Sequence, residues 1–337
     1  MKKPNKRLID DRGRIPYGVL DTPVDVINYR DFDLRTVMDK PRSALARKAR
    51  FNQFQFVSAM APGWVFGLAV VDLKLVSTAF FYLYDFKTGQ MLEQSLTQPL
   101  AKGTHIEPRP ETGVTEFRKG KTCVRITSDG HSRGVLVSGP GDLRIALNIE
   151  GDTRPLRLVC PAGYSGWVFT RKSAGLPVSG DIRWQGQSWQ CDSLSRAAVD
   201  WSCGFMRRET AWNWASVAGV LADGRAVGLN LAAGVNETGM TENALWLEGR
   251  CIKLGQARFV FDRYDETAPW QVTTDDGRID LWFEPSGVRR ERLNAWLIAS
   301  NFRQYIGTFS GTVRNEAGNS VPVDGLRGLM EDHFARW

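Results

Sequence analysis

Residues 200–236 concentrate the side chains of this chain that could do chemistry. The segment places charged and amide groups among tryptophans: Asp200, Arg207, Arg208, Glu209, Asn230 and Asn236 stand with Trp201, Trp212 and Trp214. Ordinary core strands do not need charges among large rings, whereas ligand sites are mostly apolar with a few oriented polar groups. The segment therefore predicts a lined cavity.

Three carboxylates are the candidates for a general acid or base: Asp200, Glu209 and Glu237. A carboxyl group beside tryptophan rings loses hydration, which raises its pKa toward neutrality. Arg207 or Arg208 would then hold a substrate carboxylate or stabilise developing negative charge. The alternative is that Asp200 and Glu209 form structural ion pairs with these two arginines. Both interpretations remain open at this point.

The remaining candidates are assigned to ligand binding. Trp212 and Trp214 are two residues apart, so both point to the same face of a strand. Asn230 stands in the middle of the next apolar stretch, where an inward contact with a ligand is expected. The candidate ligand-binding set is Trp201, Trp212, Trp214, Asn230, Asn236 and Glu237. Core packing explains the tryptophans equally well, and turn capping is the alternative for Asn236.

Signatures of metal and nucleotide chemistry are missing from the sequence. The three histidines, at positions 105, 131 and 333, have no i, i+4 spacing, and the five cysteines form no C-x-x-C pair. Neither a phosphate-binding glycine loop nor a G-x-S-x-G nucleophile elbow occurs. We expect no metal and no cofactor. Unpaired cysteines and the lack of an apolar signal region predict a cytoplasmic protein.

The net charge of +7 lies almost entirely in residues 1–50, which hold thirteen Lys or Arg and seven Asp. Alternation of the two signs predicts a solvated arm whose charges pair with one another, so nucleic-acid binding is not expected. The arm is also a candidate for peripheral contact with an anionic membrane surface. Four prolines predict an extended path, with one short helix near residues 43–50. We expect residues 1–40 to wrap the surface and to contribute little to the site.

Beyond residue 50 the pattern is that of an all-β chain. Alternating or β-branched segments of about 8 to 10 residues are closed by Gly or Asp-Gly, as expected of antiparallel hairpins. We predict an N-terminal arm (1–50), a first β domain (51–185) and a second (186–337), built as two antiparallel barrels or sandwiches. Residues 171–184 are interpreted as a loop linking the halves. The last segment, LRGLMEDHFARW, fits either a strand or a short helix.

Several segments in order carry a resemblance that covers almost the whole chain: FFYLYDF, GLPVSGD, DWSCG with its W-N-W, GLNLAAG-V-N, LWFEPSG, FRQYIGTFSGTV and E-D-H-F-A-R-W. Together they resemble the DUF2804 family. This resemblance implies no particular activity for the chain. More distantly the pattern is similar to two-domain lipocalin-like proteins such as carotenoid hydratases and tocopherol cyclases. This resemblance implies a β-lined cavity for apolar substrates and, in some members, protonation of an alkene by a buried carboxylic acid.

Three classes of function follow. The first is a cofactor-independent hydratase, cyclase or isomerase acting on an isoprenoid, steroid or acyl lipid, which the charges among tryptophans favour. The second is a non-catalytic lipid carrier or sensor, which the lack of a decisive catalytic signature favours. Carbohydrate binding or hydrolysis is the third, since twelve tryptophans and acidic residues are present. The expected partner is an apolar small molecule, and the oligomeric state is left open.

Overall fold

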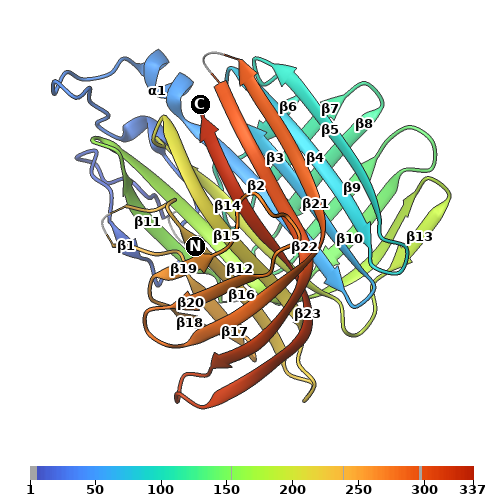
Figure 1. Cartoon of the computed structure of the whole chain (residues 1–337). Coiled ribbons are helices and arrows are strands. Elements are labelled where there is room, and N and C mark those ends of the chain that lie inside the picture. Colours follow the sequence, from blue (N-terminus) through green and yellow to red (C-terminus); the bar gives the residue numbers. More distant parts are fainter. Residues whose placement is uncertain (1–5, 153, 238, 296–297) are drawn as a thin grey trace, which may run out of the picture.

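The computed structural model describes residues 6–152, 154–237, 239–295 and 298–337. Its strands pair antiparallel in two sheets, which confirms the all-β prediction (Figure 1). The helices described are a 3-10 turn, η1 (Tyr29–Asp31), and α1 (Ala44–Arg50). Ser43 caps α1 by accepting a hydrogen bond from the Ala46 amide, so the short helix expected here is confirmed.

Fourteen of the described strands form the first sheet: β1 (Gly18–Val19), β2 (Asn52–Ala61), β3 (Trp64–Asp72), β4 (Val76–Asp85), β5 (Gln90–Pro99), β6 (Thr104–Ile106), β7 (Val114–Lys119), β8 (Thr122–Ser128), β9 (Arg133–Ser138), β10 (Arg144–Ile149), β11 (Leu156–Ala162), β12 (Gly166–Trp184), β13 (Gln187–Gln190) and β14 (Arg196–Gly204). Its main path runs β5-β4-β3-β2-β14-β12-β10-β9-β8-β7-β6. Because β14 pairs with both β2 and β12, the chain returns to the middle of this sheet before leaving it.

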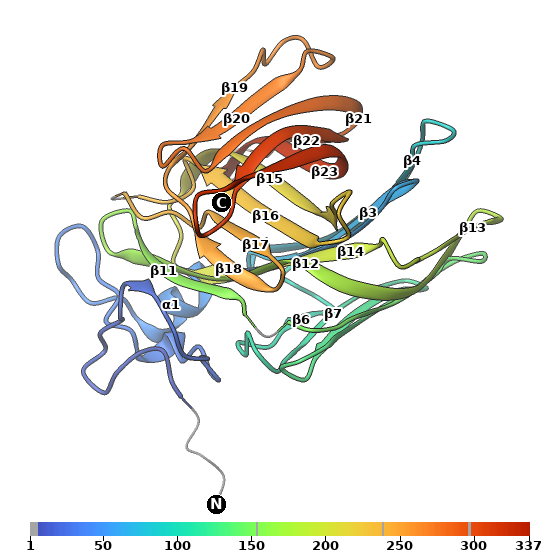
Figure 2. The same ribbon diagram turned by 90° about the horizontal axis from the view of Figure 1, so that it is seen from below.

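Nine strands form the second sheet: β15 (Glu209–Val220), β16 (Ala226–Ala233), β17 (Ala244–Leu247), β18 (Arg250–Lys253), β19 (Ala257–Val260), β20 (Trp270–Thr274), β21 (Ile279–Ala295), β22 (Ile298–Arg314) and β23 (Ser320–Arg336). Their order is β18-β17-β16-β15-β23-β22-β21-β20-β19. The last segment of the chain is therefore a strand. Figure 2 shows this sheet lying over one side of the first, with the arm at one end.

The prediction of a loop at residues 171–184 is wrong, since these residues belong to the nineteen-residue strand β12. Gly175 has a φ of +75° and marks a bulge, where the register shifts between Ala174 and Leu176 but pairing with β14 continues. The first sheet ends at Gly204 and the second begins at Glu209, later in the chain than the expected division at 185/186.

Buried apolar side chains form one core inside each curled sheet and a third between the sheets. The first core takes in six side chains of the arm: Leu8, Ile9, Val24, Ile27, Phe32 and Leu34. The charges of the arm pair locally, as expected: Arg14 with Asp10 and Arg35 with Asp33. The arm is therefore anchored to the first sheet by apolar contacts while its charges stay outside.

The backbones of the two sheets come into close contact where Gly175 of β12 meets Gly228 of β16. A Cβ atom built on Gly228 would lie 2.2 Å from the backbone carbon of Ala174. No side chain fits at that distance, so glycine is required for the sheets to pack at this spacing.

We expect Gly228→Ala to lower the free energy of unfolding by about 2–3 kcal/mol, because a strand backbone must move to admit the methyl group. Urea denaturation would measure the change. Gly63→Ala is the matched control, since a Cβ there meets nothing within 4 Å. A Gly228→Ala protein as stable as that control would show that the sheets are not packed as described.

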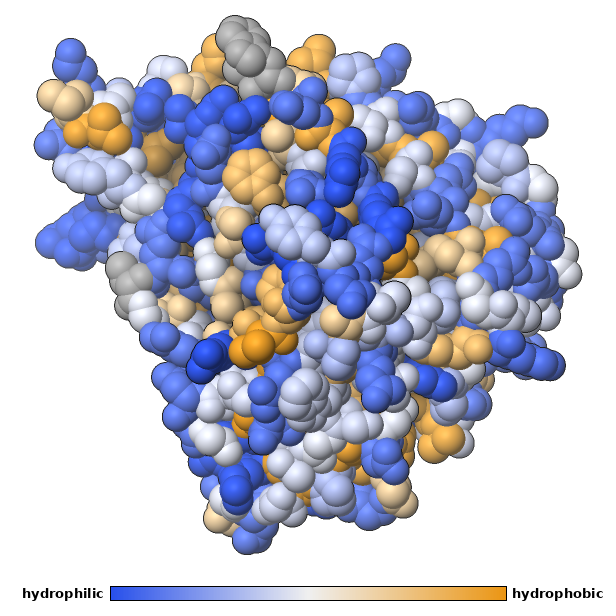
Figure 3. All heavy atoms as spheres, viewed as in Figure 1, coloured by the Kyte–Doolittle hydropathy of each residue, from blue (hydrophilic) through white to orange (hydrophobic). Residues whose placement is uncertain are grey.

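Among the described residues no helix has the length and apolar character needed to cross a membrane. On the face seen in Figure 3, hydrophobic residues form small patches separated by hydrophilic ones. The larger apolar surfaces of the chain are instead turned into its three cores.

Candidate functional site

A cavity of about 190 Å³ lies between the two sheets. Its wall is mostly aromatic and aliphatic: Phe54, Phe56, Ala69, Val71, Leu73, Phe80, Ala162, Val168, Met206, Trp212, Trp214, Val235, Phe302 and Trp337. The polar side chains on the wall come from both sheets: Asn52, Lys172, Asp200, Ser202, Arg207, Thr210, Glu242, Gln304, Glu331 and His333. An apolar chamber with a few grouped polar residues is the usual composition of a small-molecule site.

The first polar group joins the two sheets through one lysine. Lys172 of β12 places its Nζ 2.7 Å from Asp200 Oδ2 on β14 and 2.7 Å from Glu242 Oε1, which precedes β17. Ser202 donates a 2.8 Å hydrogen bond to Asp200 Oδ1. Lys172, Asp200 and Glu242 are all buried, with exposed fractions of 3%, 8% and 5%. We call these three residues the lysine triad.

The charges of the lysine triad do not balance, because two carboxylates share one ammonium. Burial raises the pKa of Glu242, and the neighbouring Asp200 charge raises it further, against the lowering effects of Lys172 and of a hydrogen bond from Asn236. The pKa of Lys172 is raised by its two carboxylate partners, although burial alone would lower it. The carboxylate partners thus favour the charged form of Lys172, and burial together with the Asp200 charge favours the protonated form of Glu242.

The second polar group lies on the strands of the second sheet. Glu331 of β23 accepts hydrogen bonds from Trp212 Nε1 at 2.8 Å and from Gln304 Nε2 at 3.0 Å. The ring of His333 packs on Trp212 with centroids 4.2 Å apart, and its Nδ1 lies 3.4 Å from Glu331 Oε1. Tyr82 OH, from the first sheet, donates a 2.5 Å hydrogen bond to Gln304 Oε1. A carboxylate and an imidazole are thus fixed side by side at the cavity wall.

Several residues expected in the site do line the cavity. They are Asp200, Arg207, Trp212 and Trp214, and the two tryptophans share a face as their spacing predicts. Asn230 lies at a small hollow of about 10 Å³ that also borders Trp214, and its Oδ1 accepts the 2.8 Å hydrogen bond of Trp214 Nε1. Its role is therefore to orient a tryptophan of the wall.

Other expected residues lie elsewhere. Trp201 is buried in the first core against Phe169, because its neighbours Asp200 and Ser202 take the cavity face and alternation turns Trp201 away. Glu209 is exposed on β15 beside Arg336, at 3.5 Å. Neither belongs to the cavity wall.

The alternative of ion pairs within residues 200–209 does not describe Asp200 and Arg207, whose partners are distant in sequence. Asp200 pairs with Lys172, and Arg207 pairs with Glu237 at 2.9 Å. Glu237 also accepts a hydrogen bond from the Gly163 amide. The carbonyl oxygen of Arg208 accepts one from the Trp337 amide. Asn236 donates to Cys160 Sγ at 3.5 Å and lies beside Glu242.

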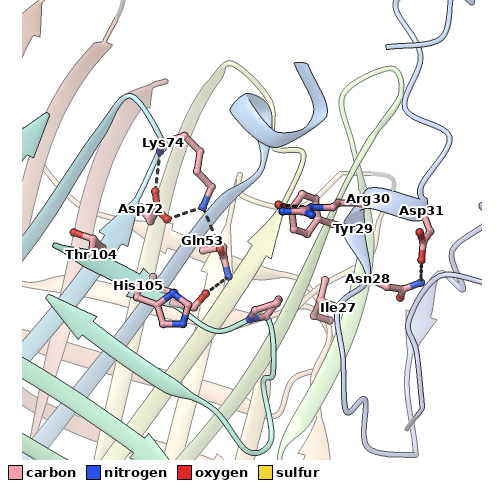
Figure 4. A pocket seen from close by; sticks show the side chains of 12 residues that line it. Ile27, Asn28, Tyr29, Arg30, Asp31, Gln53, Asp72, Lys74, Thr104 and His105 are labelled. Carbon is pink, nitrogen blue, oxygen red and sulfur yellow. Dashed lines mark hydrogen bonds and ion pairs between the residues drawn. The ribbon is translucent and has the colours of Figure 1, made fainter. Parts of the chain in front are cut away.

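A second hollow, of about 450 Å³, lies between the arm and the first sheet (Figure 4). Its buried carboxylate, Asp72, is neutralised by Lys74 at 2.6 Å, and Lys74 also donates to Gln53. On the arm side, Tyr29 stacks on Phe51 with ring centroids 3.8 Å apart. Asp72, Lys74 and Gln53 satisfy one another here, whereas the cavity between the sheets groups two carboxylates on one lysine, so that cavity is the stronger candidate.

The family model described as "Domain of unknown function (DUF2804)" matches residues 1–337. The chain belongs to the DUF2804 family. Among solved structures it is similar to CghA with Sch210972 (10% identity, 95% of this chain and 99% of that chain, TM-score 0.55). It is also similar to a provisionally assigned AttH from Nitrosomonas europaea (15%, 83% and 92%, TM-score 0.54) and to kievitone hydratase from Nectria haematococca (12%, 83% and 88%, TM-score 0.51).

A comparison with curated proteins gives no match for this DUF2804 chain. At 10–15% identity, the similar structures show that the fold is shared. They confirm the two-sheet lipocalin-like architecture expected from the sequence. Any role of individual residues must therefore be argued from the geometry of this chain.

Proposed function

We propose that this DUF2804 protein is a cofactor-independent hydratase-type lyase that acts on a carbon–carbon double bond of an apolar small molecule. The observation that carries the proposal is the lysine triad at the wall of an aromatic cavity. There, burial and Asp200 favour the protonated form of Glu242. The similarity to kievitone hydratase supports the same class of reaction.

The two polar groups of the cavity suit the two halves of such a reaction. In hydration, the carboxyl proton of Glu242 is transferred to one alkene carbon, and the other carbon becomes electron-deficient. A water molecule forms the new C–O bond there, and its proton passes to the Glu331–His333 pair. The Glu331–His333 pair then releases its proton to solvent and Glu242 takes one up, so atoms and charges balance over the cycle. Elimination of water is the same sequence reversed.

The aromatic wall supports this chemistry in two ways. The rings of Phe56, Phe80, Trp214 and Phe302 provide apolar surface for an isoprenoid, steroid or acyl body. The negative faces of such rings also attract positive charge that develops on a substrate carbon. A cavity of this kind favours binding and carbocation-like chemistry together. A carrier without catalysis would need only the first property.

The binding half of the proposal can be tested on purified protein by native mass spectrometry. We expect an apolar ligand retained from the expression host, or a supplied isoprenoid or acyl probe, to appear as a one-to-one adduct. Ala69→Phe should remove the adduct, because Ala69 lines the cavity and a phenyl ring there fills it. Circular dichroism of that variant would establish that the β fold is kept. An adduct of equal abundance in folded Ala69→Phe protein would place the ligand outside the cavity.

A further inference from the structure

The register of strand β2 distinguishes the two ends of the cavity. On β2, Asn52 pairs with Gly204 and Phe56 pairs with Asp200, so these two cavity residues mark two levels of the wall. Four residues along a strand span about 13 Å. Asn52 stands just beyond α1, and Trp337, another wall residue, is the last residue of the chain. We call the end of the cavity beside α1, marked by Asn52, the mouth, and the level of Asp200 the deep end.

Arginines gather at the mouth. Arg50 ends α1, two residues before Asn52. Arg207 lines the cavity, and the carbonyl oxygen of the next residue, Arg208, accepts the 3.0 Å hydrogen bond of the Trp337 amide. In Figure 1, α1 and the C-terminus lie at the same end of the molecule. Arg207 is paired with Glu237 at 2.9 Å, so Arg50 is the arginine that places positive charge at this end of the cavity, and the lysine triad lies at the other end.

The arginines nearest α1 have few counter-charges. Partial burial lowers the pKa of Arg50, and the nearby positive charges of Arg42 and Arg208 lower it further. Within the described part of the chain, no carboxylate lies within 4.0 Å of Arg42 or Arg50. A positive field at the rim of a low-dielectric cavity attracts anions. Guanidinium groups bind carboxylates and phosphates well because their paired N–H donors match the oxygen geometry.

A hydrogen-bond donor without a partner stands at the same level. The indole Nε1 of Trp337 is buried and has no hydrogen-bond partner among the described residues, and Trp337 lines the cavity. Buried N–H groups of this kind are normally paired, so this N–H is available to an acceptor oxygen of a ligand. A charged head with oxygen atoms would satisfy this N–H together with the arginines.

We propose that the ligand is an amphiphilic anion. Its carboxylate, or another oxygen-bearing anionic head, binds Arg50 and the indole N–H of Trp337 at the mouth, beside Arg207, which is paired with Glu237. Its apolar body fills the aromatic cavity, and its far end reaches Asp200 and Glu242. The inference rests on the proposed function and narrows its substrate class. It excludes neutral hydrocarbons and cationic amphiphiles as the preferred ligands.

Two matched probes test the proposal by isothermal calorimetry: dodecanoic acid below its critical micelle concentration and dodecan-1-ol below its solubility limit. We expect the carboxylate to bind wild-type protein at least about tenfold more tightly than the alcohol. In Arg50→Gln this preference should fall to about threefold or less, with alcohol affinity unchanged. High salt should weaken binding of the acid and spare the alcohol. Arg258→Gln, an exposed arginine on β19, is the control and should keep the full preference.

The outcomes separate the two proposals. Equal affinities of acid and alcohol in wild-type protein, or a loss of both probes in folded Arg50→Gln, would overturn the anionic head while leaving an apolar cavity in place. If neither probe binds wild-type protein and no retained adduct is found, the proposed function fails and the inference fails with it.

Discussion

Glu242→Gln is expected to abolish turnover while sparing ligand binding. Glutamine keeps the shape and the hydrogen-bonding capacity of the side chain but has no acidic proton to transfer. Loss of one general acid lowers the rate by about 10²- to 10⁴-fold. Affinity for the ligand should change by less than about threefold, since Glu242 is one polar group on a mostly apolar wall. Steady-state kinetics and calorimetry on the same preparation would measure both quantities.

The pH dependence of turnover has a definite sign. Glu242 acts as an acid only while protonated, and burial raises its pKa above the usual carboxyl range. The turnover rate of wild-type protein should therefore fall as pH rises through that raised pKa. This decrease with pH should be missing in Glu242→Gln. Asp200→Asn is the companion variant, because removing the Asp200 charge lowers the pKa of Glu242 and shifts this decrease to lower pH. An unchanged pH profile in Glu242→Gln would remove Glu242 from the role of acid.

Lys172→Met is expected to cause the largest loss of stability among single changes at the cavity. It leaves Asp200 and Glu242 buried without their shared cation, and breaking a buried ion pair from one side costs about 3–5 kcal/mol. Urea denaturation at pH 7 would measure the change. Lys102→Met, at an exposed turn, is the matched control and should stay within about 0.5 kcal/mol of wild type.

Two further measurements distinguish lost charge pairing from lost packing. The double variant Lys172→Met/Asp200→Asn should regain part of the stability, because one unpaired carboxylate has been removed. The sign of the pH effect follows from the pKa of Lys172, which is raised above its ordinary 10.5 in the folded protein. The contribution of Lys172 to the free energy of unfolding is fully present below pH 10.5. It disappears as pH rises through the pKa of Lys172 in the folded protein. A Lys172→Met deficit that is the same with or without Asp200 would contradict the charge argument.

The fold could be predicted because its signals are local. Short alternating segments closed by Gly or Asp-Gly indicate antiparallel hairpins, and the structure has them. The strand β12 was missed because Gly175 and Pro177 together resemble a turn. In the structure Gly175 makes only a bulge, and a bulge cannot be told from a turn without knowing that β14 continues to pair across it. The pairing partner lies more than twenty residues away.

The candidate site could be predicted only in part, for a related reason. Trp212 and Trp214 follow from period-two alternation, and Asp200 follows from its aromatic surroundings. Lys172 and Glu242 carry no local signal. Lys172 lies 28 residues before Asp200 in the sequence, and Glu242 lies 42 residues after it. Their contact depends on how the two sheets pack.

Adjacency in sequence also misled the prediction. The sequence interpretation assigns both Asp200 and Trp201 to the cavity, although neighbouring residues of one strand point to opposite faces. At the other end of the chain, Glu331 and His333 lie in the segment whose type, strand or helix, the sequence leaves open. Once β23 is known to be a strand, residues two apart share a face, and both side chains line the cavity.

The most direct test of the central claim is to follow solvent hydrogen into the ligand. The bound ligand, or an alkene probe shown to bind, is incubated with the protein in deuterium oxide, and deuterium on carbon is measured by mass spectrometry and NMR. We predict time-dependent incorporation at one alkene carbon with wild-type protein and none above background with Glu242→Gln. Incorporation at equal rates in the two proteins, or no incorporation into a ligand that demonstrably occupies the cavity, would contradict proton transfer from Glu242.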